Sequence, residues 1–89
     1  LFEVPDTDVS SLDIYIVATI PSFLSRQVTK LMAVNISGTF NYNEYGSLSI
    51  GVPVADFTMG VSGGNVQLYV TPSSSYATEY KVVVTQYSA

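Results

Sequence analysis

The side chains that could do acid–base or metal chemistry in this 89-residue chain are its seven carboxylates, because histidine and cysteine are absent. Paired carboxylates can hydrolyse glycosides, and clustered ones can bind calcium. Asp6 and Asp8 stand close together, but the glycine and glutamate of an EF-hand loop do not follow them. Asp13, Glu44 and the other acids match no motif. We therefore predict no catalytic residue, no metal and no cofactor, in a protein that is not an enzyme.

The composition excludes further classes of function. Without cysteine the chain has no disulfide and no thiol nucleophile, and without histidine it cannot form a Ser-His-Asp triad. Its three cations, Arg26, Lys30 and Lys81, are too few to neutralise a stretch of phosphates, so we expect no nucleic-acid partner. The longest apolar run, from Ile14 to Ile20, is too short to span a bilayer, so we expect no membrane insertion.

The seven tyrosines are the residues best suited to recognition, because tyrosine combines a rigid ring with one polar tip. Asn41, Asn43 and Gly46 favour turns, so we interpret residues 41–46 as the end of a strand and a hairpin loop. Tyr42, Glu44 and Tyr45 are then candidate receptor or partner contacts on a distal surface. The alternative is that tyrosine is here simply a good strand residue.

Strands must position these side chains, since β-branched and aromatic residues alternate at period two. One face of residues 12–20 contains Leu12, Ile14, Ile16, Ala18 and Ile20. In residues 27–40, Val28, Met32, Val34 and Ile36 share a face, and Gly38 suggests a bulge. Ser62 to Asn65 is the strongest hairpin signal. We expect inward side chains in the later strands at Phe57, Met59, Val66, Leu68, Val70, Tyr80, Val82 and Val84.

Short strands separated by Gly and Pro predict one all-β domain. The expected fold is a small antiparallel β-sandwich, jelly-roll-like or immunoglobulin-like, with about six to eight strands. We assign residues 12–89 to this domain and residues 1–11 to an N-terminal arm or linker. The chain starts at Leu1 rather than at methionine, which suggests part of a longer polypeptide or a processed end.

Low charge is the most informative property of the whole chain. Charged residues make up 11%, against about 25% in ordinary soluble domains, and the net charge is −4. A small domain without disulfides and with so few charges is expected to be partly covered by other subunits. Candidate inter-subunit contacts on faces opposite the core are Tyr15, Val17, Tyr69 and Val83. The alternative is a monomer with a neutral Ser/Thr/Asn surface.

Residues 28–87 resemble small β-sandwich modules of tailed-phage virion appendages, such as tail fibres. The shared succession is a Glu-Tyr-Gly turn at residues 44–46, a Ser-Gly-Gly-Asn hairpin at 62–65, a Val-x-Leu-x-Val-Thr-Pro strand at 66–72 and a Tyr-Lys-Val strand from residue 80. The resemblance implies a structural module facing outward from a virion, as a fibre, appendage or capsid-decoration domain. It also implies a homo-oligomer, with a trimer favoured, that contacts other virion proteins. It carries over no catalytic residue.

Two ligand classes remain open for such a module, a host-surface glycan and a host protein. The alternative to a virion protein is a carbohydrate-binding module of a larger cell-surface protein or enzyme. Tyr42, Tyr45 and Tyr76 would then form an aromatic platform for sugar rings. The absence of tryptophan counts against that alternative.

Overall fold

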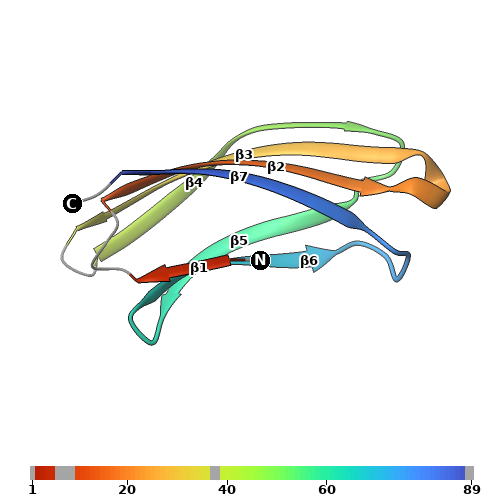
Figure 1. The fold of residues 1–89 in the computed structure, drawn as a ribbon. Coiled ribbons are helices and arrows are strands. Elements are labelled where there is room, and N and C mark those ends of the chain that lie inside the picture. The colour runs from red at the N-terminus through yellow and green to blue at the C-terminus, as the bar shows by residue number, and fades with distance from the viewer. Residues whose placement is uncertain (1, 6–9, 37–38, 88–89) are drawn as a thin grey trace.

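The computed structural model describes residues 2–5, 10–36 and 39–87, which form seven strands in two antiparallel sheets (Figure 1). One sheet has three strands, in the order β1 (Phe2–Pro5), β6 (Asn65–Pro72) and β5 (Ala55–Ser62). The other has four, in the order β4 (Thr39–Ile50), β3 (Ser25–Ile36), β2 (Ser11–Ile20) and β7 (Glu79–Tyr87). The sheets form two layers, which confirms the predicted small antiparallel β-sandwich.

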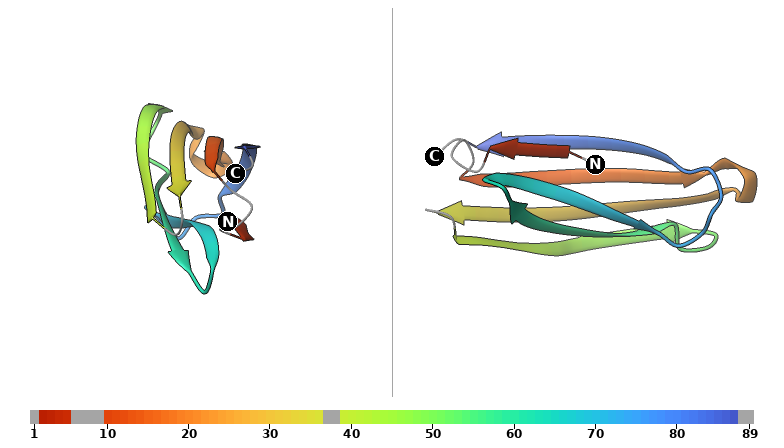
Figure 2. Two further views of the ribbon diagram at one scale, coloured as in Figure 1. Left: turned by 90° about the vertical axis from the view of Figure 1, so that its left-hand side faces the viewer. Right: turned by 90° about the horizontal axis from the view of Figure 1, so that it is seen from below.

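The strands follow a Greek-key path. β2, β3 and β4 are consecutive antiparallel neighbours, the chain then crosses to the other sheet for the β5–β6 hairpin, and β7 returns beside β2. The long strands give the molecule an elongated shape of 43 × 22 × 16 Å (Figure 2). The one helical turn in the described ranges is a 3-10 turn, η2 (Pro21–Phe23), so none of those residues lies in a helix that could cross a membrane.

The core lies between the two sheets and largely follows the predicted alternation. Every second residue of β2, from Leu12 to Ile20, is buried, as expected. Phe57, Met59, Val66 and Leu68 cover these side chains from the three-stranded sheet. The predicted inward residues Val70, Tyr80, Val82 and Val84 are half-buried against the same core. This agreement arises because each of these strands has one clearly more apolar face.

Strand β3 has its apolar side facing outward. Val28, Met32, Val34 and Ile36 share a face as predicted, but that face is the surface of the sandwich. The opposite side of β3 is largely polar and is nevertheless buried: Ser25, Gln27, Thr29, Leu31, Ala33 and Asn35. The pairing of β3 with β2 over ten residues sets this orientation, because it holds the buried side of β2 and the polar side of β3 on the same face.

Two local expectations are corrected. Residues 41–46 are not a loop, because they lie within β4. Gly38, where a bulge was expected, lies outside the described residues, and a bulge is present where β4 pairs with Lys30 and Leu31. Phe2–Pro5, assigned to the N-terminal arm, form β1 and pair with β6. The predicted Ser62–Asn65 hairpin is confirmed, with positive φ at Gly63 and Gly64.

The buried Gln27 side chain joins the two sheets. Its Oε1 accepts hydrogen bonds from the backbone N–H of Val54 at 2.9 Å and of Ala55 at 3.3 Å. Its Nε2 donates to the carbonyl of Ala55 at 2.8 Å and to Thr29 Oγ1 at 3.0 Å. Gln27 lies in one sheet and thus bonds the backbone at the point where the chain enters β5 of the other sheet.

Replacing Gln27 by alanine should destabilise the fold by about 2–4 kcal/mol, because buried backbone groups of Val54 and Ala55 would lose their partners. The melting temperature, followed by circular dichroism, should fall by roughly 10–20 °C. The matched control is Gln67→Ala, since the Gln67 amide donates to Glu3 at an exposed site where water can replace the lost bonds. Equal losses in the two variants would contradict the role given to Gln27.

Candidate functional site

The surface of the four-stranded sheet that points away from the core, called here the outer face, is unusually apolar. Side chains on this face alternate with the buried ones in β2, β3 and β7. Leu48 is 78% exposed, Ile50 75% and Ile36 72%. Nine large apolar or aromatic side chains of this face are exposed: Tyr15, Met32, Val34, Ile36, Tyr45, Leu48, Ile50, Val83 and Tyr87.

A β-bulge in β4 places part of this surface. Glu44 pairs with Leu31 and Gly46 with Lys30, so Tyr45 is an extra residue between two regular pairs. One extra residue reverses the alternation of every following side chain. Leu48 therefore pairs with the outward Val28, and Ile50 with the outward Arg26. Without the bulge, Leu48 and Ile50 would point toward the inner side of the sheet.

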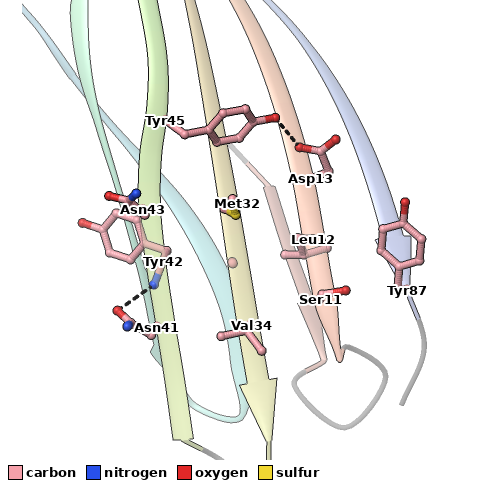
Figure 3. Close-up of a pocket in the computed structure, with 11 residues that line it drawn as sticks. Ser11, Leu12, Asp13, Met32, Val34, Asn41, Tyr42, Asn43, Tyr45 and Tyr87 are labelled. Atoms are coloured by element: carbon pink, nitrogen blue, oxygen red, sulfur yellow. Dashed lines mark hydrogen bonds between the residues drawn. The ribbon is translucent and has the colours of Figure 1, made fainter.

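The bulged Tyr45 lies near the middle of β4 on the outer face. Its ring extends across β3 toward β2, and its hydroxyl donates a hydrogen bond of 2.7 Å to Asp13 Oδ1 on β2 (Figure 3). Beside it lies a depression of about 620 Å³ that ends at Tyr87 on β7. The floor is apolar and the rim is polar and aromatic. The lining residues are Ser11, Leu12, Asp13, Met32, Ala33, Val34, Asn41, Tyr42, Asn43, Tyr45 and Tyr87.

All three cations of the chain lie on the outer face. Arg26 Nε donates to Thr19 Oγ1 at 3.1 Å, and Lys30 Nζ lies 5.6 Å from the centroid of the Tyr15 ring. Lys81 pairs with the outward Val17. Two acids, Asp13 and Glu79, share this face, giving three positive and two negative groups.

The exposed side of the three-stranded sheet has the opposite character. Its outward positions hold two acids and no cation. The one large aromatic side chain there, within the described strands, is Tyr69. The remaining positions are small or polar: Glu3, Asp56, Thr58, Gly60, Gln67 and Thr71. The two outer surfaces of the sandwich therefore differ in both polarity and sign of charge.

The four predicted inter-subunit residues do not form one surface. Tyr15, Val17 and Val83 are neighbours on the outer face, because Tyr15 pairs with Val83 and Val17 lies two residues further along β2. Tyr69 lies on β6, on the opposite side of the sandwich. Its hydroxyl donates to Gln67 in the same strand.

The predicted contacts in β4 are also divided. Tyr45 lies on the outer face, whereas Tyr42 is half-buried and packs against the core. Glu44 pairs with the inward Leu31 but is exposed. Tyr76, the third member of the predicted aromatic platform, packs edge to face on Phe23 at the end of the sandwich where β2 finishes, with 4.2 Å between ring centroids. Tyr45 bonds Asp13, and the seven-residue step along β2 from Asp13 to Ile20 spans roughly 20 Å, so Tyr45 and Tyr76 do not form one platform.

The sequence predicts only part of the outer face. The spacing of Met32, Val34 and Ile36 shows that they share a side, but not which side of the strand is buried. Leu48 and Ile50 had no signal, since the bulge that turns them outward has no sequence mark beyond the nearby Gly46. In residues 2–5, 10–36 and 39–87 no cluster of acidic side chains could hold a metal, and Asp6 and Asp8 lie outside these ranges.

No known family model matches this sequence, and comparison with curated proteins and with solved structures found no match. The outer face is therefore interpreted from its own chemistry.

The hydrogen bond from Tyr45 to Asp13, and secondarily desolvation, raise the pKa of the Tyr45 phenol. The fold thus favours neutral Tyr45. The stabilisation of the folded state by this hydrogen bond is present below the ordinary phenol pKa of about 10 and is lost as the pH rises through the raised value.

We expect Asp13→Asn to lower the Tyr45 pKa, measured from the ring-carbon chemical shifts in an alkaline NMR titration. Glu44→Gln is the control, and an unchanged pKa in Asp13→Asn would contradict the contact.

Proposed function

We propose that this chain is a non-enzymatic assembly module that binds other protein subunits through its outer face. The observation that carries the proposal is the set of nine exposed large side chains on one side of one sheet. At about 200 Å² for a large side chain, their exposed fractions amount to roughly 1,000 Å². Monomeric proteins rarely present an apolar patch above about 300–600 Å². A covering partner removes this surface from water.

The distribution of charge supports the same function. The chain has few charges, and the outer face has both signs between its apolar side chains. Interfaces that form specifically combine an apolar centre with a few charged groups that set register and orientation. The exposed acids Glu3 and Asp56 lie on the other side of the sandwich, where they keep a surface in contact with water.

We further propose that the assembly is the virion of a tailed phage, with this module in a fibre, an appendage or a capsid decoration that faces outward. What supports this is the sequence resemblance of residues 28–87, although Glu44–Gly46 lie within β4 rather than in the expected turn. A module in that position is expected to contact other virion proteins, and copies of itself. The predicted trimer stays a prediction.

Leu48→Lys should break the assembly, because it places a charge in the most exposed part of the apolar surface. We expect the wild-type chain to sediment as an oligomer and the variant to associate at least about 30-fold more weakly, on the scale of losing one large apolar contact and burying a charge in its place. Thr58→Lys adds the same charge to the opposite side of the sandwich and should leave association unchanged. A wild-type chain that stays monomeric and captures no other virion protein would refute the proposal.

A second function, saccharide binding, is favoured by the depression beside Tyr45. Tyr45 and Tyr87 border it, and Asp13, Asn41 and Asn43 line it. Sugar rings are amphipathic, so an apolar floor with carboxylate and amide groups at the rim suits them. This site differs from the predicted platform, since it uses Tyr87 in place of Tyr76.

A glycan array separates the two functions. If the depression binds a saccharide, the wild-type chain should bind selected glycans, and Tyr45→Ala should lower binding by about 10-fold or more, on the scale of a lost aromatic contact. Tyr76→Ala is the control, because Tyr76 lies at the other end of the sandwich. Equal binding by the two variants would exclude the depression as a sugar site.

A further inference from the structure

We infer that the partner covering the outer face is a second copy of this chain, packed face to face about a twofold axis. The inference rests on the proposed assembly function and names its partner.

The first argument is the match of polarity and area. The apolar outer face needs an apolar counterpart, and the exposed side of the three-stranded sheet is polar and acidic, so head-to-tail stacking of copies would pair unlike surfaces. Two outer faces match each other. The nine large residues of each face expose roughly 1,000 Å², and a stable interface needs about 800 Å² from each partner. Two copies are therefore sufficient to cover the face.

The second argument is the position of two opposite charges near the centre of the face. Asp13 lies on β2 and Lys30 on β3, the two central strands of the sheet. Asp13 pairs with Met32, and Tyr15 with Lys30, so the two charges lie in adjacent rows. They are thus one strand spacing of about 5 Å apart across the sheet and about 7 Å apart along it.

A twofold axis in the plane of the interface exchanges the two sites. An axis that lies between these rows and runs perpendicular to the strands brings the Lys30 row of one copy over the Asp13 row of the other. The two side chains are then offset by one strand, about 5 Å. A lysine side chain spans that offset, and symmetry forms the pair twice. Within the described residues, Asp13 accepts only the hydroxyl of Tyr45, Lys30 contacts only the Tyr15 ring, and neither is in an ion pair.

The twofold arrangement is tested by charge reversal. In Lys30→Glu alone, glutamate faces the partner's Asp13, and in Asp13→Lys alone, lysine faces the partner's Lys30. Because like charges in an interface are strongly unfavourable, each variant should associate about 10- to 100-fold more weakly than wild type. The double variant should recover association, and an equimolar mixture of the two single variants should form a heterodimer. Sedimentation and native mass spectrometry measure these masses.

Two controls keep the result interpretable. Asp56→Lys reverses a charge on the exposed side of the three-stranded sheet, away from the proposed interface, so it should associate as wild type does. Thermal melting of each variant confirms that these exposed substitutions leave the fold intact.

The outcomes separate this inference from the assembly function. Suppose that Leu48→Lys breaks the oligomer but the charge reversals show no rescue, or the oligomer has the mass of a trimer. Either result overturns the twofold pairing and leaves the assembly function standing. A chain that is monomeric by itself and binds only a different protein likewise overturns the twofold pairing and leaves the assembly function standing. A dimer with rescue in both the double variant and the mixture supports the inference.

Discussion

The β-bulge at Tyr45 is the constraint on which the outer face depends. A sheet exposes alternate residues, so one inserted residue decides the side on which all later side chains of the strand lie. In β4 it turns Leu48 and Ile50 toward the outward Val28 and Arg26, and it leaves the small Ser47 and Ser49 on the inner side. Leu48 and Ile50, the two most exposed apolar side chains of the outer face, are on that surface because of this single irregularity.

The buried side of β3 completes the same arrangement. A polar strand face inside a small core would be costly unless its groups were paired. Gln27 meets this requirement with four hydrogen bonds, and Thr29 accepts one of them. Ser25 Oγ accepts the backbone N–H of Val52 at 3.1 Å. Gln27 and Ser25 thus hold the crossover between the sheets in place, and the outward apolar side chains Met32, Val34 and Ile36 stay exposed.

The sequence predicts the fold where one face of a strand is plainly more apolar. This holds for Leu12 to Ile20 in β2, for Val66 and Leu68 in β6, and for the glycine hairpin between β5 and β6. It fails for β3, since alternation shows that Met32 and Val34 share a side but not that the more polar side is buried. It fails again at residues 41–46, where turn-forming asparagines lie in a bulged strand whose pairing with β3 outweighs their local preference.

The site was less predictable than the fold, because a surface is defined by pairing across strands far apart in sequence. Asp13 and Tyr45 are 32 residues apart, and their contact depends on the register of β2, β3 and β4 together. The low charge of the chain predicts that a partner covers part of its exterior, and this stays a prediction. The sequence spacing does not show that its three cations all lie on the apolar side of the sheet. Charges there can set the register of a partner without supplying most of the contact area. Assembly through this face would also stabilise a small core, because a partner that binds only the folded chain shifts the folding equilibrium toward it.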